Sequence, residues 1–329
     1  MPKIVTIGGG TGTFTLLSGL KKYIVDITSI VTMADSGGST GRLRDEFGYL
    51  PVGDVRMALA ALSDTNGRNI IRELFLYRFS KGEGLSGHNF GNLFLVALTD
   101  ILGSEEAAIE YAGKVLRVSG RVLPVTASRT DIVAKYTDGT ITHGESHIDE
   151  PEFPFDQEKK IDHIYLEPSV SATKKAVETI QSADLIVLGP GDMYTSTVPN
   201  LLVKGIKEAL CSTNAKILYN INLMTKFGQT TGFTATDHLS EVTKYIGRTP
   251  DFVVMNNSTF PPEVLAHYEK EHEYPVEDDL KEGQGYQIIR ENVVAGEVTQ
   301  RKAGDTLKRS LIRHDSDKIA AVIMRMTDR

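Results

Sequence analysis

Short apolar runs rich in β-branched residues alternate along this chain with longer segments whose apolar residues recur every three or four positions. The short runs predict strands at Lys3–Ile7, Ile27–Met33, Asp184–Leu188, Lys216–Ile221, Asp251–Met255 and Tyr286–Arg290. The longer segments predict helices at Phe14–Tyr23, Val55–Ser63, Asn69–Phe79, Phe90–Leu102, Glu105–Val118, Ser171–Ser182, Val198–Leu210, Ala235–Ile246, Glu263–Glu271 and Lys318–Met326. This alternation predicts an α/β protein, a Rossmann-like three-layer α/β/α sandwich around a mostly parallel sheet.

The middle of the chain has a different pattern. Arg121–Ala127, Asp131–Tyr136 and Thr140–Thr142 read as short strands, and Asp138-Gly139 between the last two is a strong hairpin signal. We therefore expect a small antiparallel sub-region at 120–164 within a single domain spanning 1–329. The tail, 261–329, is expected to be a C-terminal extension packed on the same domain.

Three glycine-rich turns, Gly8–Thr13, Asp35–Arg42 and Gly189–Ser196, each follow a predicted strand and lead into a helix-like run. In a parallel sheet such turns open on the same edge. Backbone amides at helix starts attract anions, and glycine lets a phosphate approach closely. The sequence therefore predicts one crevice that holds a phosphorylated ligand.

The first turn has two interpretations. It lacks the last glycine of a dinucleotide fingerprint, because Thr13 stands there, and no Gly-Lys-Ser/Thr follows as in a P-loop. Thr13, together with the many hydroxyl groups of the second turn, disfavours an NAD-dependent oxidoreductase. A tight turn that needs glycine only for packing remains the alternative, but the position after a strand favours phosphate contacts from Gly9, Gly10, Thr11 and Gly12.

Asp35 closes the second predicted strand, where a carboxylate can hold a substrate hydroxyl or Mg²⁺. The alternative is an ordinary turn aspartate. Ser39, Thr40 and Arg42 offer hydroxyl and guanidinium groups that suit a pyrophosphate. Arg42 and Arg44 can instead pair with Asp45 and Glu46 on a solvated helix.

Further polar residues stand at predicted helix starts and strand ends, each with a structural alternative. Asp54, Asn89 and Ser104 are predicted N-caps, and for Asp54 that role is favoured over a ligand contact. For ligand contacts we single out His88, Asn92, Gly191, Asp192, Tyr194, Thr195, Asn222 and Arg313. Their alternatives are a structural histidine, loop-capping amides and surface charge.

Composition narrows the class of protein. A formal charge of −7 over 329 residues argues against non-specific binding to nucleic acid or to anionic membranes. Cys211 is the only cysteine, so no disulfide within the chain and no zinc-finger pattern is possible. No signal-peptide pattern and no apolar run near 20 residues is present, so we expect a cytoplasmic protein without membrane insertion.

Taken together, these motifs resemble one family, the 2-phospho-lactate transferase (CofD)-like superfamily, and within it the YvcK-like gluconeogenesis-factor branch. The resemblance covers nearly the whole chain and rests on the blocks Gly8–Phe14, Asp35–Arg44, Gly53–Arg56, Gly87–Leu93, Gly189–Asn200 and Asn222–Gly232. The enzymes of the superfamily transfer a phospholactyl group from a nucleotide-activated donor to a deazaflavin alcohol. The YvcK-like branch is associated with UDP-sugar binding and with cell-wall and shape control that depends on the carbon source.

The resemblance implies a UDP-sugar ligand, most simply UDP-N-acetylglucosamine, with no required cofactor and with Mg²⁺ as an optional ion. It also implies a homodimer and an unidentified protein partner. The enzymes typically carry paired aspartates after the second strand and then a Pro-Asp-Leu-Asp-Thr segment. Here Asp35-Ser36 and Pro51–Arg56 stand in those places, which favours a regulatory protein. The alternative is a Mg²⁺-dependent transferase that uses a nucleoside-diphosphate-linked donor.

Overall fold

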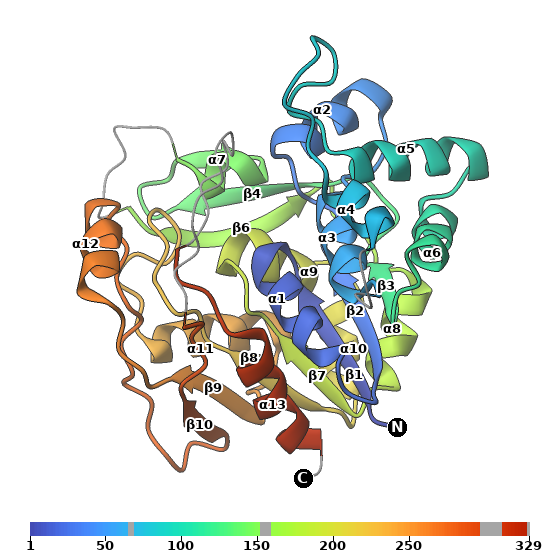
Figure 1. Cartoon of the computed structure of the whole chain (residues 1–329). Coiled ribbons are helices and arrows are strands. Elements are labelled where there is room, and N and C mark those ends of the chain that lie inside the picture. Colours follow the sequence, from blue (N-terminus) through green and yellow to red (C-terminus); the bar gives the residue numbers. More distant parts are fainter. Residues whose placement is uncertain (65–68, 152–158, 297–310, 328–329) are drawn as a thin grey trace.

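A seven-stranded parallel sheet forms the centre of the computed structural model, which describes residues 1–64, 69–151, 159–296 and 311–327 (Figure 1). The strand order is β10-β9-β8-β7-β1-β2-β3. The strands are β1 (Lys3–Gly8), β2 (Asp26–Val31), β3 (Arg121–Pro124), β7 (Leu185–Leu188), β8 (Lys216–Asn220), β9 (Phe252–Asn256) and β10 (Gln287–Glu291). The Rossmann-like sandwich predicted from the sequence is confirmed.

The strand order reverses next to β1. From β1 the chain builds outward through β2 to β3, and then returns to the other side of β1 with β7, β8, β9 and β10. Ligands of open α/β sheets bind at the carboxyl ends of the strands beside such a reversal. The three glycine turns follow β1, β2 and β7, which are adjacent strands, so they emerge side by side at that edge.

Helices cover both faces of the sheet because successive strand residues point to opposite sides. Val5 and Ile7 belong to one hydrophobic core and Ile4 to the other, which explains why the strands are apolar throughout. The first core includes α8 (Lys174–Gln181), α9 (Val198–Leu201), α10 (Ile206–Ser212) and α11 (Ala235–Ile246). The second includes α1 (Gly10–Leu20), α3 (Gly53–Leu62), α6 (Glu105–Leu116), α12 (Pro262–Lys270) and α13 (Ser316–Thr327).

A separate antiparallel sheet of order β5-β4-β6 lies above the main sheet in Figure 1. It consists of β4 (Asp131–Tyr136), β5 (Ile141–His143) and β6 (Ile161–Glu167), with the short helix α7 (Glu145–Asp149) attached. The sub-region expected at 120–164 therefore differs at both ends. β3 pairs in parallel with β2 in the main sheet, and β6 continues to Glu167. Residues 152–158 lie outside the described part of the chain.

Some local predictions differ from the structure. The helix α2 (Gly38–Phe47) follows the second glycine turn directly, and α4 (Ile70–Leu76) and α5 (Phe90–Leu102) lie where helices were predicted. The helix predicted at Val198–Leu210 is instead two helices, α9 and α10, and a π-helical turn, η1 (Met193–Thr197), precedes them. Gly205, with φ of +96°, separates the last two.

Two of the three predicted N-caps are confirmed. The side chains of Asn89 and Ser104 accept hydrogen bonds from the backbone amides of Gly91 and Ala107 at the starts of α5 and α6. Asp54 is not an N-cap, since it lies inside the first turn of α3 and its carboxylate bonds a different segment.

The C-terminal part packs on the same sheet. β10 pairs with β9, and α13 lies beside α1. A Cβ atom on Gly19 of α1 would lie 1.9 Å from the carbonyl oxygen of Ser316, so this contact requires glycine. Residues 297–310 and 328–329 of the expected extension lie outside the described residues. Among the helices that are described, none has the length and apolar character needed to cross a membrane.

Candidate functional site

The first and third glycine turns touch each other at the carboxyl ends of β1 and β7. A Cβ atom on Gly12 would lie 2.2 Å from the carbonyl oxygen of Pro190, and one on Gly191 would lie 3.4 Å from that of Gly9. Ser196, in the third turn, also lies against the first turn, because its Oγ is 3.4 Å from the Cβ position of Gly10. Thr11, in the first turn, is exposed.

The start of α3 connects the second turn to the first. The amide of Gly10 donates a 2.8 Å hydrogen bond to Oδ1 of Asp54. A Cβ atom on Gly53 would lie 2.2 Å from Oδ2 of Asp35 and 2.7 Å from Oγ1 of Thr40. The amide of Gly37 donates a 2.8 Å bond to Oδ1 of Asp35. The start of α3 therefore contacts the first and second turns, and the first turn also contacts the third.

Asp35 and Asp54 form a closely spaced carboxylate pair in this crevice. Burial, and secondly the charge of Asp35, raises the pKa of Asp54 to about 7. Burial also raises the pKa of Asp35, although hydrogen bonds from Gly37 and Thr40 and the charge of Arg56 oppose this. Groups with such perturbed pKa values in a crevice mark candidate functional sites. The pair favours a bound proton or cation near neutral pH.

The helix α7 brings two more carboxylates to the crevice. The amide of Ser146 donates a 3.1 Å bond to Oγ of Ser36, which attaches α7 to the second turn. Burial, followed by the charges of Asp35, Asp149 and Asp54, raises the pKa of Glu145 well above its usual value. The small antiparallel sheet thus contributes acidic groups to the same site.

A second cluster lies beside the third turn. Asp192 lies close to Asp149, and burial, with the charge of Asp149 adding to it, raises the pKa of Asp192 to about 6. Nζ of Lys226 is 3.6 Å from Oδ1 of Asp149. Burial alone would lower the pKa of Lys226, but the charges of Asp192, Asp149 and Glu273 raise it. Lys226 therefore stays protonated and balances part of the negative charge.

Several predicted ligand residues form a buried network behind Asp35. Nδ2 of Asn92 donates to Oγ of Ser39 and to Oγ1 of Thr40, and Nε of Arg56 donates a 2.8 Å bond to Oδ1 of Asn92. Nδ1 of His88 lies 3.2 Å from Oγ of Ser39. Burial, then the charge of Arg42, lowers the pKa of His88. These side chains hold α2, and with it Asp35, in position.

The arginines of α2 bond residues outside this buried network. Arg42 is exposed and donates a 3.1 Å bond to the carbonyl oxygen of Ser86. Arg44 pairs with Asp45, as the alternative interpretation held, and also with Asp131 of β4 at 2.6 Å. The second pair connects α2 to the small sheet.

The predicted residues of the third turn take different places. Tyr194 is 1% and Thr195 4% exposed, so both side chains are buried beneath the turn. Burial, followed by the charge of Glu241, raises the pKa of Tyr194. Nδ2 of Asn222 donates a 2.9 Å bond to the carbonyl oxygen of Gly191 and so fixes the turn from the neighbouring loop.

The segment before α13 reaches the carboxyl end of β8. His314 is buried, and its Nε2 lies 2.9 Å from Nδ2 of Asn220, the last residue of β8. Burial lowers the pKa of His314 to about 4, so the imidazole is neutral at pH 7. Arg313 is half-buried beside it.

These oxygen donors bear on the metal prediction. In the described ranges no group of three or more His, Cys, Asp or Glu side chains is arranged to hold an ion. Two carboxylates, Asp35 and Asp54, match the donor set with which proteins bind Mg²⁺, namely one or two carboxylates completed by water and ligand phosphates. The side chains present therefore fit a Mg²⁺ ion that arrives with a phosphorylated ligand.

A sequence profile of the 2-phospho-L-lactate transferase CofD family matches residues 4–294. The chain belongs to this CofD family. Its relatives include the gluconeogenesis factor of Bacillus subtilis, 40% identical over 327 residues that span 98% of this chain and 97% of the relative. The putative gluconeogenesis factor of Thermotoga maritima is 39% identical over 326 residues, 99% of each chain. The chain therefore lies in the gluconeogenesis-factor branch of the CofD family.

The fold is also shared with a solved structure. A crystal structure of a Bacillus halodurans protein superposes with a TM-score of 0.87 at 38% sequence identity, covering 98% of this chain and 99% of the other. The resemblance stated from the motifs is thus confirmed over the chain's length.

Sequence reasoning missed several crevice residues. Glu145 and Asp149 were overlooked because they belong to a five-residue helix after a hairpin, far in sequence from the glycine turns. Lys226 lies within the family block Asn222–Gly232 but was not singled out there. Asp54 was assigned to capping, although its Gly-Asp pair matched one of the family blocks. That match was the one signal that could have found it.

Proposed function

We propose that this protein binds a nucleotide sugar, UDP-N-acetylglucosamine or a close relative, and acts as a regulatory protein. The observation that carries the proposal is that the first glycine turn contacts the third and the start of α3 joins the first to the second, beside the reversal of strand order. Diphosphates bind at this place in Rossmann-like sheets. The uridine and the sugar come from the resemblance to the gluconeogenesis-factor branch.

The diphosphate is proposed to lie over the starts of α1 and α2. Neither helix has a side-chain N-cap, so the amides of their first turns remain available to an anion, except that of Gly10, which bonds Asp54. The facing carboxylates, Asp35 and Asp54, would repel that anion unless Mg²⁺ or protons intervene. Binding is therefore expected to be stronger with Mg²⁺ than with EDTA.

The test is calorimetric titration with UDP-N-acetylglucosamine in Mg²⁺ and in EDTA, with UDP, GDP and NADH as comparisons. We expect tight binding of the uridine compounds, a loss with EDTA, and weakening in Asp35→Asn. Asp184→Asn, at the opposite end of β7, is the matched control and should bind normally. Absence of binding by every uridine and guanosine diphosphate compound would refute the proposal.

A transferase of the CofD type is the second candidate, and the Asp35–Asp54 pair supports it. The sequence comparison counted one carboxylate as missing after the second strand, but the fold brings Asp54 to Asp35 from α3. Incubation with UDP-N-acetylglucosamine and a deazaflavin alcohol separates the two. A regulatory protein leaves the nucleotide sugar intact, whereas a transferase releases its nucleotide.

The regulatory role is proposed to serve cell-wall synthesis and cell shape during growth on gluconeogenic carbon sources, in the cytoplasm. Occupancy of the crevice would be reported to a protein partner. Deletion of the gene in a gluconeogenic bacterium, complemented by wild type or Asp35→Asn, tests this. Equal rescue of cell shape by both would argue against a role for the crevice.

A homodimer is proposed as the working form. Exposed apolar side chains gather on the packed helices α4, α5 and α6, and Ile71 of α4 and Val115 of α6 line one shallow depression. The patch comprises Ile70, Ile71, Leu74, Ile101, Leu102, Tyr111 and Val115, which are 39–76% exposed. Contiguous exposed apolar surface of this kind marks interaction sites, and we propose a second copy of this chain as its occupant.

A further inference from the structure

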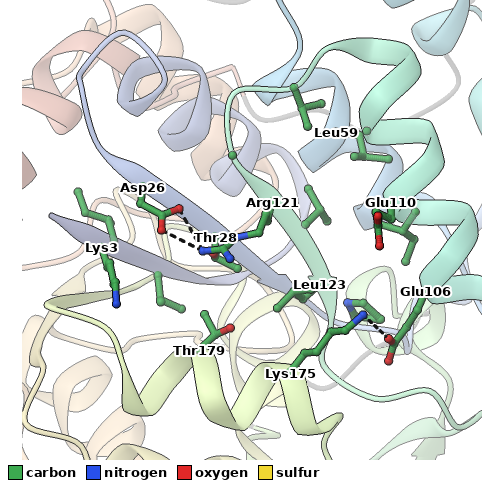
Figure 2. A pocket seen from close by; sticks show the side chains of 18 of the residues that line it. Lys3, Asp26, Thr28, Leu59, Glu106, Glu110, Arg121, Leu123, Lys175 and Thr179 are labelled. Atoms are coloured by element: carbon green, nitrogen blue, oxygen red, sulfur yellow. Dashed lines mark hydrogen bonds and ion pairs between the residues drawn. The ribbon is translucent and has the colours of Figure 1, made fainter. Parts of the chain in front are cut away.

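A groove of about 790 Å³ surrounds β3, the edge strand of the main sheet, between α6 and α8 (Figure 2). It lies near the amino ends of β1 and β2, where Lys3 and Asp26 line it. The glycine turns emerge at the carboxyl ends of the same strands. The groove and the crevice are therefore at opposite edges of the sheet and share none of the residues described above as crevice residues.

The inner wall of the groove is largely apolar. Val122 of β3 faces the core on the α6 side, where Leu59 and Ile109 join it, whereas Leu123 faces the α8 side with Val5. The groove thus follows both faces of one short strand. Small-molecule sites are typically concave, mostly apolar and of 300–1,000 Å³, with a few polar groups for orientation.

Every acid that lines the groove already has a cation within 4 Å. These pairs are Asp26 with Arg121, Glu106 with Lys175, Glu110 with Lys114, and Glu178 with Lys174. The Lys175–Glu106 pair, at 3.0 Å, spans from α8 to α6 and is drawn in Figure 2. In the described ranges, the side chains of Lys3 and Arg117 have neither a hydrogen-bond nor an ion-pair partner.

We propose that this groove is a second ligand site, which takes a small amphipathic organic anion. Its apolar body lies against Val122 and Leu123, and its anionic group is held by the unpaired cations Lys3 or Arg117 at the rim. Charge complementarity favours an anionic ligand, because the rim has two unpaired cations and no unpaired acid. This proposal does not depend on the nucleotide-sugar function.

The walls argue against a larger occupant. Helices α6 and α8 stand on either side of β3, so the edge of a second sheet cannot approach it without contacting them. The strand has only four residues and ends at Pro124, which has no amide to donate. Both features hinder an edge strand from pairing with a strand of another chain.

The test uses two named probes, the fluorescent anion 1-anilinonaphthalene-8-sulfonate and the competitor decanoate. We expect the full chain to enhance the fluorescence of the sulfonate and decanoate to displace it. Thr179→Trp, at a half-exposed position of α8 that lines the groove, should lower affinity at least tenfold by filling the space. The exposed pair Lys3→Gln with Arg117→Gln should lower decanoate affinity about fivefold but leave that of neutral 1-decanol unchanged.

Lys135→Gln, an exposed lysine on β4 outside the groove, is the matched control and should change nothing. Unaltered probe binding in both groove variants would overturn the proposal, as would the absence of any displaceable binding by the wild type. Displacement by acidic peptides with no displacement by decanoate would also overturn it, in favour of a peptide site. Each variant is titrated with UDP-N-acetylglucosamine as well, so that failure at the crevice is recognised separately.

Discussion

The backbone amide of Gly10, at the start of α1, donates a 2.8 Å hydrogen bond to the carboxylate of Asp54, 44 positions later on α3. This bond ties the first glycine turn to the residue that faces Asp35. It also uses one of the amides that an anion would otherwise bind. A ligand phosphate and the Asp54 carboxylate therefore compete for Gly10, and Mg²⁺ between them would relieve that competition.

Asp54→Asn should stabilise the protein at pH 8 and have little effect at pH 4. The folded-state pKa of Asp54, about 7, exceeds its unfolded value of 3.8, so the folded state holds the extra proton. The contribution of Asp54 to the free energy of unfolding is therefore fully present below pH 4, falls as the pH rises toward 7, and stays low above it. We expect a gain of about 1–3 kcal/mol at pH 8 in urea denaturation.

The control for Asp54→Asn is Asp162→Asn, at an exposed position on β6. Asp237→Asn is unsuitable because Asp237 takes part in the capping box of α11. A stabilisation of Asp54→Asn that is equal at pH 4 and pH 8 would contradict the electrostatic explanation. The same variant should lose the Mg²⁺ dependence of nucleotide-sugar binding.

Gly12→Ala should lower the melting temperature and abolish nucleotide-sugar binding. Its Cβ atom would lie 2.2 Å from the carbonyl oxygen of Pro190, so one of the two turns must move. Overpacking of this kind costs about 3 kcal/mol. Gly84→Ala, where no atom lies within 4 Å of the new Cβ, should behave as wild type in the same thermal scan. Normal binding by Gly12→Ala would show that contact between the turns is unnecessary.

Lys226→Gln should destabilise the protein by about 2 kcal/mol at pH 8, because it leaves Asp149 and Asp192 without their neighbouring cation. Adding Asp149→Asn should restore most of the loss, because the remaining carboxylate then has no charged neighbour in that pair. The measurement is a double-mutant cycle by urea denaturation. Strictly additive effects would exclude the electrostatic coupling.

Asn222→Ala should weaken nucleotide-sugar binding about fivefold while leaving the fold intact. Its side chain donates to the carbonyl oxygen of Gly191, and one such hydrogen bond is worth about 1 kcal/mol. Asn257→Ala removes a comparable 3.0 Å bond to the carbonyl oxygen of Arg290, away from the turns. Calorimetry should distinguish the two variants, and equal affinities would contradict a role for Asn222 in holding the third turn.

Ile71→Glu should convert the proposed dimer to a monomer in light scattering after size exclusion. The side chain is 43% exposed and belongs to the apolar patch, so the change costs little in the monomer but buries a charge in a dimer. Tyr274→Glu, at an exposed tyrosine outside the patch, should leave the assembly unchanged. A wild-type monomer would contradict the proposal directly.

Most elements of the main sheet and its helices were predictable because each depends on local pattern, whereas α7 and β6 were not predicted. The strand Asp131–Tyr136 and the helices Phe90–Leu102 and Ala235–Ile246 have the residue bounds that the periodicity predicted. The break between α9 and α10 was missed because apolar periodicity continues across Gly205. Asp54 was misassigned because the sequence before a helix looks the same whether its carboxylate caps that helix or bonds another segment.

The sequence by itself determined that three glycine turns follow apolar strands, and strand polarity then places them at one edge of a parallel sheet. Only the tertiary structure decided which side chains share that edge. Glu145, Asp149 and Lys226 reach the crevice through strand order and the docking of the small sheet, and Tyr194 and Thr195 turn out to be buried beneath it. Contacts between residues so distant in sequence depend on how the elements pack, which no local pattern encodes.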